Sequence, residues 1–134
     1  MDVKSMERKK VLVVEDIKQM FLLYRYCLDS HFDVHMAKSF KEVQNFENKD
    51  DVVVTILDYH IPGESFENIL TYIKDNYPFS KRLLISGHAD SLGLQEKYGN
   101  DLDGVFSKPL DDYTKLAGYL VDLVGPENLQ RSKV

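Results

Sequence analysis

The sequence predicts an α/β fold in which a doubly wound, five-stranded parallel sheet carries helices on both of its faces. Short apolar runs alternate along the chain with longer segments whose apolar residues recur at helical spacing. The apolar runs are nearly continuous, as expected for strands that are covered on both faces. Because strands that alternate with helices pair in parallel through right-handed crossovers, these observations together describe a three-layer sandwich.

Five strands are expected from the short runs rich in valine, isoleucine and leucine. The third run, VVVTILD, is expected to be the most buried of them. The five expected strands cover residues 10–16, 33–37, 52–58, 81–86 and 104–108. In the strand order 2-1-3-4-5, which we expect for a doubly wound sheet of this kind, the second strand lies at the edge.

Helical spacing and capping residues locate five helices between and after these strands. Ser39, followed by Glu42, has the pattern of a capping box at the start of the second helix. Pro78 ends the third helix, and Gly93 weakens the fourth. The helices are expected over about 17–30, around 40–46, around 66–73, at 90–99, and from Asp111 or Asp112 to Gly125-Pro126.

Length and composition indicate one globular domain and exclude several functional classes. Of the 134 residues, 43% are apolar and 29% charged; residues 9–125 are expected to form the domain, between an N-terminal extension (1–8) and a C-terminal tail (126–134). No apolar run approaches the ~18 residues of a membrane span. The formal charge of −5 argues against direct binding of nucleic acid. The single Cys27 excludes an internal disulfide and fits a cytoplasmic location.

Polar side chains stand at the carboxyl ends of four of the five expected strands. Glu15 and Asp16 end the first strand, Asp58 the third, Ser86 the fourth and Lys108 the fifth. A strand that meets solvent explains any one of them alone, but it does not explain the combination. Since ligands bind at the carboxyl ends of parallel strands, near the point where the strand order reverses, we expect these five side chains to meet in one site.

The chemistry of these five residues indicates transfer of a phosphoryl group. Two like charges about 4 Å apart repel by roughly 4 kcal/mol at an effective dielectric constant near 20, so clustered carboxylates raise a pKa or bind a cation. Carboxylate oxygens suit Mg²⁺, which completes its coordination with water and phosphate. Lys108 pairs with an anion beside the metal, and the Ser86 hydroxyl donates a hydrogen bond. Asp58, at the centre, is the expected nucleophile, which forms an aspartyl phosphate.

Four segments also resemble the motifs of the receiver domain of bacterial response regulators. The segments VLVVED, ILDYHIPG, LLISGHAD and VFSKPL occur in the family's order and at family-like intervals, across about residues 9–125. The resemblance implies a flavodoxin-like fold in which Asp58 accepts a phosphoryl group from a sensor histidine kinase or a histidine phosphotransfer protein. It implies a two-component signalling switch that catalyses its own phosphorylation and slow dephosphorylation, and not a metabolic enzyme.

The resemblance further implies a role for each residue of the site. The implied Mg²⁺ ligands are Asp16, Asp58 and the backbone carbonyl of His60, with Glu15 acting mostly through water. Ser86 and Lys108 hold the phosphoryl oxygens, and the peptide bond between Lys108 and Pro109 is expected to be cis. The signal is expected to reach a downstream protein target through the face formed by the fourth helix, the fifth strand and the fifth helix.

One position departs from the family pattern. Receiver domains often carry an aromatic residue three positions before the lysine, and its ring moves inward on phosphorylation. Here that switch position is Val105. Phe106 is adjacent, but successive residues of a strand face opposite sides, so Phe106 cannot replace the missing ring. We therefore expect a muted or rerouted conformational change.

Two histidines lie where the resemblance places residues that influence the lifetime of the phosphate. His60 follows Asp58 by two positions, and His88 follows Ser86 by two. Imidazoles at the mouth of the site would interact with the entering water or with a partner in a pH-dependent way. The alternative is that both are exposed loop residues without such a role.

Other functions are consistent with parts of the pattern. A non-switching interaction module would keep the fold and bind a partner without phosphorylation, which Val105 and the weak fourth helix favour. A haloacid-dehalogenase-like phosphohydrolase would need a second acid where this chain has His60. A dinucleotide-binding domain would need glycines where the chain has EDIKQM. The sequence does not distinguish a stand-alone receiver from a piece of a longer chain.

Overall fold

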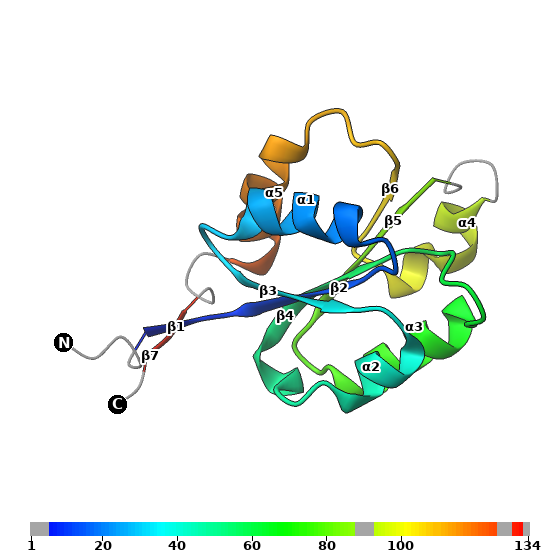
Figure 1. Ribbon diagram of the computed structural model, residues 1–134, viewed down its shortest axis with the longest axis horizontal. Coiled ribbons are helices and arrows are strands. Elements are labelled where there is room, and N and C mark those ends of the chain that lie inside the picture. The colour runs from blue at the N-terminus through cyan, green and yellow to red at the C-terminus, as the bar shows by residue number, and fades with distance from the viewer. Residues whose placement is uncertain (1–5, 88–92, 126–129, 133–134) are drawn as a thin grey trace.

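The computed structural model describes residues 6–87, 93–125 and 130–132, and it confirms the predicted α/β architecture. Five strands form one parallel sheet in the order β3-β2-β4-β5-β6, which is the predicted order 2-1-3-4-5 (Figure 1). Their bounds are β2 (Lys10–Val14), β3 (Asp33–Ala37), β4 (Val52–Leu57), β5 (Lys81–Ser86) and β6 (Gly104–Ser107). Strands β2 and β4 both end one or two residues earlier than expected. The acidic residues therefore follow the strands and are not part of them.

Helices cover both faces of the sheet, as predicted. One face carries α1 (Lys18–Leu28) and α5 (Leu116–Val124), whereas α2 (Phe40–Asn45) and α3 (Phe66–Asn76) cover the other, with α4 (Leu94–Tyr98) beside them (Figure 1). Short 3-10 turns are η2 (Lys49–Asp51), η3 (Gly99–Asp101) and η4 (Tyr113–Lys115).

The starts of α2 and α4 depend on Ser39 and Gly93, two residues noted in the sequence. The Ser39 hydroxyl accepts a hydrogen bond from the backbone N–H of Glu42 at 3.2 Å, and the Glu42 carboxylate accepts one from the backbone N–H of Lys38. The carboxylate thus reaches one residue further back than in a regular capping box. Helix α4 begins only after Gly93, whose φ of 63° is a left-handed conformation that glycine adopts without strain. Residues 90–92, the first three of the expected fourth helix, lie outside the described residues.

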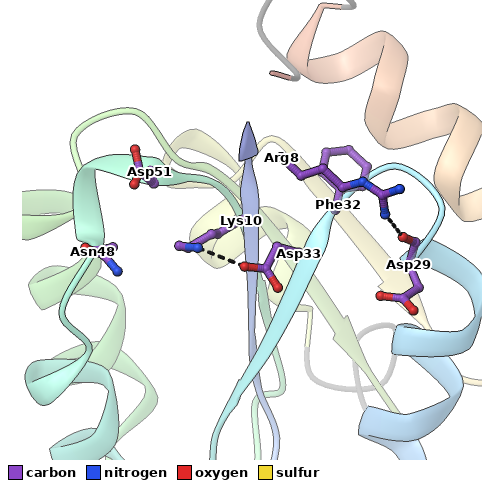
Figure 2. A pocket seen from close by; sticks show the side chains of 7 residues that line it. All are labelled: Arg8, Lys10, Asp29, Phe32, Asp33, Asn48 and Asp51. Atoms are coloured by element: carbon purple, nitrogen blue, oxygen red, sulfur yellow. Dashed lines mark hydrogen bonds and ion pairs between the residues drawn. The ribbon is translucent and has the colours of Figure 1, made fainter. Parts of the chain in front are cut away.

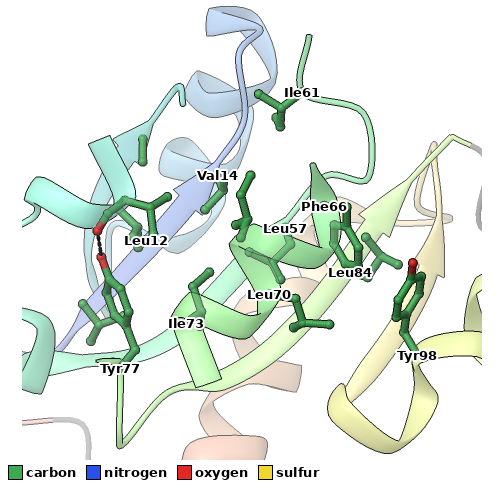
Figure 3. Close-up of a cluster of buried hydrophobic side chains, with 14 of the residues drawn as sticks. Leu12, Val14, Leu57, Ile61, Phe66, Leu70, Ile73, Tyr77, Leu84 and Tyr98 are labelled. Atoms are coloured by element: carbon green, nitrogen blue, oxygen red, sulfur yellow. Dashed lines mark hydrogen bonds between the residues drawn. The ribbon is translucent and has the colours of Figure 1, made fainter. Parts of the chain in front are cut away.

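The two faces of the sheet bury separate cores because successive residues of a strand point to opposite sides. Leu12 and Val14 of β2 pack with α2, α3 and α4 (Figure 3). Val11 and Val13 of the same strand pack with α1 and α5. In the first core, the Tyr77 hydroxyl donates a 2.6 Å hydrogen bond to the backbone carbonyl of Val43, which joins α3 to α2 (Figure 3).

The described ends of the chain pair with each other. Strand β1 (Met6–Arg8) and strand β7 (Gln130–Ser132) form an antiparallel two-stranded sheet apart from the main one (Figure 1). Strand β1 lies in the predicted N-terminal extension (1–8), and strand β7 lies in the predicted C-terminal tail (126–134). Among the residues that the structure describes, no helix combines the length and the apolarity that crossing a membrane requires.

A hollow of about 610 Å³ opens at the amino end of the sheet, opposite the strand ends that carry the acidic residues (Figure 2). Its cationic side chains are bound by neighbouring protein groups. The Arg8 guanidinium donates to the backbone carbonyl of Asp29, and Lys10 Nζ lies 2.8 Å from Asp33 Oδ2 (Figure 2). Because both cationic side chains are already hydrogen-bonded to protein groups, we assign no chemistry to the hollow.

The ion pair in this hollow predicts a small, pH-dependent contribution to stability. Partial burial alone would raise the pKa of Asp33, but hydrogen bonds from Lys10 and His35 outweigh it and hold the pKa below the ordinary value of 3.8. The stabilisation is therefore present at neutral pH and is lost as the pH falls below 3.8 through the lowered pKa. We expect Asp33→Asn to lower the free energy of unfolding by about 0.2–1 kcal/mol at neutral pH, since half-exposed pairs are screened by solvent.

Urea unfolding of both proteins at neutral and at acid pH measures this difference. It should disappear at acid pH, where Asp33 is protonated in the wild type. An Asp75→Asn variant, at an exposed position of α3, is the control. A difference that persists unchanged in acid would show that the effect of Asp33→Asn is not electrostatic.

A buried hydroxyl in the second core predicts a stabilising substitution. Tyr24 is only 1% exposed, and its hydroxyl has no hydrogen-bond partner among the described residues. Because an unsatisfied buried polar group costs about 1–3 kcal/mol, Tyr24→Phe should raise the free energy of unfolding by about 1 kcal/mol. Tyr77→Phe is the matched comparison. The Tyr77 hydroxyl is hydrogen-bonded to the Val43 carbonyl, so removing this hydroxyl should destabilise the protein. Chemical unfolding of the two variants, with opposite expected signs, checks the assignment.

Candidate functional site

The three acidic residues after β2 and β4 meet at the carboxyl edge of the sheet. Carboxylate oxygens of Glu15, Asp16 and Asp58 lie within 4.8 Å of one another. Backbone hydrogen bonds extend the parallel ladder past the strand ends: Glu15 N donates to Ala37 O at 3.0 Å, and Asp58 N donates to Val14 O at 3.2 Å. The parallel register therefore brings residues 43 positions apart in the sequence into one acidic cluster.

Lys108 reaches the same cluster from the other side. Its Nζ lies 2.9 Å from Glu15 Oε1 and 3.4 Å from Asp58 Oδ2. Its backbone N–H donates to the carbonyl of Ser86 at 3.0 Å, which places the start of the following loop against the end of β5. The peptide bond between Lys108 and Pro109 is cis, as predicted. Ser86 itself is fully buried at the end of β5.

Burial and charge pairing set the protonation of the site. Glu15 is only 1% exposed, and this burial raises the pKa of its carboxyl, although Lys108 counteracts the shift. Burial alone would lower the pKa of Lys108, but the hydrogen bond to Glu15 and the charge of Asp58 outweigh it and raise that pKa above its ordinary value. The ammonium is therefore charged at neutral pH and partly neutralises the carboxylates.

The donor set fits a divalent cation such as Mg²⁺. The clustered donors are hard carboxylate oxygens, which Mg²⁺ prefers. Both oxygens of Glu15 face protein donors, since Lys108 binds Oε1 and the backbone N–H of Ile17 lies 3.3 Å from Oε2. Asp16 is partly exposed, and among the described residues the Asp58 carboxylate has one side-chain hydrogen bond, the 3.4 Å contact with Lys108. The latter two carboxylates are thus the better placed to bind a cation directly.

The segment between β4 and α3, called here the β4–α3 loop (residues 58–65), contains the turn predicted at Pro62-Gly63. The backbone N–H of Glu64 donates to the carbonyl of Ile61 at 3.0 Å, and Gly63 has a φ of 77°. A type II turn requires a positive φ at its third position, which glycine supplies, and proline is common at its second. The Ile61 side chain is buried in the first core, so the loop is attached to the body of the protein next to His60.

An aromatic cluster beside the site was not predicted from the sequence. The centroid of the Tyr59 ring lies 5.2 Å from that of Phe66 in α3 and 6.5 Å from that of Tyr98 in α4. The centroids of the Phe66 and Tyr98 rings are 5.0 Å apart. The pattern does place Phe66 on the inward stripe of its helix. It does not indicate that Tyr59, next to Asp58, meets a ring from α4.

The structure describes the switch position Val105 and His60, but not His88. Val105 packs against the core that contains α3 and α4, whereas the Phe106 ring lies on the opposite face, 5.4 Å from the ring of Tyr119. Val105 and Phe106 thus face opposite sides of the sheet, as predicted. His60 is exposed, with its ring edge-on to Tyr59. His88 lies outside the described residues.

Comparison with known proteins shows that the chain has the fold of response regulator receiver domains. No protein-family model matches the sequence, and none of the curated proteins compared with it matches. Solved structures do match. A CheY-like receiver domain from Methanospirillum hungatei has a TM-score of 0.75 and 19% identity, over 91% of this chain and 97% of that one.

Two further receiver domains have TM-scores of 0.74. The one from Clostridium thermocellum is 22% identical over 89% of this chain and 96% of its own, and the one from Vibrio parahaemolyticus is 21% identical over 90% and 95%. The resemblance inferred from the motifs is thus confirmed at the level of the fold. In this fold, the cluster of Glu15, Asp16 and Asp58 lies at the carboxyl edge of the sheet.

Proposed function

We propose that this protein is a two-component response regulator receiver that accepts a phosphoryl group on Asp58 in a Mg²⁺-dependent reaction. The observation that carries the proposal is the cluster of three carboxylates within 4.8 Å, with Lys108 Nζ beside two of them. An ammonium beside clustered carboxylates suits a site in which a phosphoryl group is transferred by positioning and charge neutralisation. The receiver-domain fold supports the same function.

In the proposed reaction, a carboxylate oxygen of Asp58 attacks the phosphorus of a phosphohistidine. A P–O bond forms as the P–N bond breaks, and the bonding electrons remain on the donor imidazole, which takes up a proton from solvent. Lys108, 3.4 Å from Asp58 Oδ2, neutralises charge on the phosphoryl oxygens. The Ser86 hydroxyl is the proposed hydrogen-bond donor to a further phosphoryl oxygen. Slow attack of water on the aspartyl phosphate then resets the protein.

Mg²⁺, when bound, would neutralise negative charge shared by the carboxylates and the phosphoryl oxygens. The ligands proposed for it are Asp16, Asp58 and the backbone carbonyl of His60. Glu15 is proposed to contribute mostly through water, in agreement with its contacts to Lys108 and to the backbone of Ile17.

The proposed partners are those of a signalling switch. The phosphoryl donor is a sensor histidine kinase or a histidine phosphotransfer protein, and the downstream protein target binds the face formed by α4, β6 and α5. The proposal includes a receiver domain over residues 9–125, a cytoplasmic location, and no metabolic activity. His60 and His88 are proposed to modulate the lifetime of the phosphate. Replacing both should then alter the dephosphorylation rate between mildly acid and neutral pH.

Intact-mass analysis after incubation with Mg²⁺ and a small acyl phosphate tests the proposal. We expect the wild type to gain the mass of one phosphoryl group and Asp58→Asn to gain none. Omission of Mg²⁺ should also prevent the gain. A wild-type protein that stays unmodified under conditions that phosphorylate a known receiver would contradict the proposal.

Two observations favour a second candidate, an interaction module that binds its partner without phosphorylation. The switch position is Val105, and α4 has only five residues in the structure. NMR spectra of the α4, β6 and α5 face, with and without a phosphoryl mimic, distinguish the candidates. Small chemical-shift changes on this face agree with a rerouted switch. Unchanged shifts in a protein that does become phosphorylated favour the interaction module. Large shifts around Val105 contradict both expectations.

A further inference from the structure

The side chain of Glu64 ties the β4–α3 loop to helix α2. Its Oε2 accepts a hydrogen bond from the backbone N–H of Phe40 at 3.1 Å, across 24 residues of sequence. Phe40 is the first residue of α2, where a backbone N–H has no partner within the helix. A carboxylate there forms a charge-assisted hydrogen bond at the positive end of the helix.

This contact completes a set of anchors along the loop. At its start, Asp58 N–H donates to the carbonyl of Val14 in β2, and the Ile61 side chain is buried in the first core. At its end, the Ser65 hydroxyl accepts from the backbone N–H of Asn68 and caps α3. Glu64 adds the contact with α2. The backbone between Asp58 and Ser65 is therefore held from several elements.

The anchored segment contains two of the proposed Mg²⁺ ligands, the Asp58 carboxylate and the His60 carbonyl. A backbone carbonyl binds a cation well only when the main chain holds it in one orientation, because Mg²⁺ requires near-ideal octahedral geometry. His60 is exposed, so its own side chain is not packed into the core. The next residue, Ile61, is buried in the first core, and the turn from Ile61 to Glu64 joins the main chain of His60 to the Glu64 side chain.

We propose that Glu64 is a positioning residue, which holds the β4–α3 loop in the conformation that binds Mg²⁺ by tying it to the start of α2. This inference rests on the proposed function, since it assigns a role toward the metal of that site. By linkage, Mg²⁺ binding stabilises the contact between Glu64 and Phe40 as much as the contact favours Mg²⁺. The simpler possibility, in which Glu64 only caps α2, gives different results in the following experiment.

The experiment measures the Mg²⁺ dissociation constant of variants of the 134-residue chain by NMR titration. Loss of an interaction that orients a metal ligand typically weakens metal binding 10- to 100-fold, so we expect Glu64→Ala to weaken Mg²⁺ binding about tenfold. Glu64→Gln keeps an oxygen that accepts from Phe40 N–H and should bind within about threefold of the wild type. Ser39→Ala is the matched control, because it removes another cap of the same helix without touching the loop.

Hydrogen exchange provides a readout that does not depend on activity. Mg²⁺ should slow exchange of the Phe40 amide in the wild type and in Ser39→Ala, but not in Glu64→Ala. If Glu64→Ala and Ser39→Ala bind Mg²⁺ as the wild type does, while Asp58→Asn does not, the positioning role is wrong and the proposed function stands. A wild type that binds no Mg²⁺ would contradict the proposed function itself. Circular dichroism checks that each variant is folded.

Discussion

Lys108→Met is expected to lower the free energy of unfolding by about 3 kcal/mol at neutral pH and to reduce phosphorylation strongly. The substitution removes the partner of Glu15, which is 1% exposed, and breaking a buried ion pair costs about 3–5 kcal/mol. It also removes the cation next to Asp58. Since one lost electrostatic donor reduces a rate about 10²- to 10³-fold, the rate of acyl-phosphate labelling should fall by that order.

The loss of stability should depend on pH with a definite sign. Burial raises the pKa of Glu15 above its ordinary value of 4.5, and removal of Lys108 raises it further. Below pH 4.5 the Glu15 carboxyl is protonated in both the folded and the unfolded protein, so its raised pKa does not change the free energy of unfolding. As the pH rises from 4.5 through the raised pKa of the folded protein, the free energy of unfolding falls. Urea unfolding should therefore show a large difference from the wild type at neutral pH and a smaller one in acid.

A double variant separates the two effects of Lys108. Glu15→Gln combined with Lys108→Met leaves no buried charge without a partner, so most of the stability should return. Phosphorylation should remain slow, because the lysine is still absent. If the double variant is as unstable as Lys108→Met alone, the loss comes from packing of the lysine side chain and not from the ion pair.

Asp16→Asn is expected to change stability in opposite directions with and without Mg²⁺. In the metal-free protein it removes one of three carboxylates that lie within 4.8 Å, so relief of repulsion should add about 1 kcal/mol to the free energy of unfolding. In the wild type, Mg²⁺ at about 100 times its dissociation constant should add about 2.7 kcal/mol. The variant should lose most of that gain, because Asp16 is a proposed ligand.

Thermal unfolding in EDTA and in Mg²⁺ measures both effects. The variant should be the more stable protein in EDTA and the less stable one in Mg²⁺. Asp122→Asn, at an exposed position of α5, should change neither result. An Asp16→Asn protein that keeps the full Mg²⁺-induced shift would exclude Asp16 as a ligand.

Much of the fold was predictable because its signals are local. The continuous apolar runs indicated buried parallel strands, and all five were found within two residues of their expected ends. Ser39 and Asp112 cap helices through hydrogen bonds to residues two or three positions away. The start of the last helix was predicted less accurately. The segment after Asp112 begins as the 3-10 turn η4, in which the Asp112 carboxylate accepts a hydrogen bond from Thr114 N–H, and α5 follows it.

The candidate site was predictable for a related reason. In a parallel sheet the carboxyl ends of neighbouring strands meet at one edge, so polar residues that follow the strands must approach one another. In the strand order, β4, which precedes Asp58, lies between β2, which precedes Glu15, and β6, which precedes Lys108. The distances among them could not be predicted, and neither could the closer contact of Lys108 with Glu15 than with Asp58.

Periodicity, capping and turn residues act over a few positions, so the strands and helices of the main fold, their parallel pairing and the polar residues at the strand ends could be predicted from the sequence. The contacts of Glu64 with Phe40 and of Tyr59 with Tyr98, and the pairing of strands β1 and β7, became visible in the folded chain. Each of these contacts joins loops or chain ends whose relative positions depend on how both cores pack. No repeat or local spacing in the sequence encodes them.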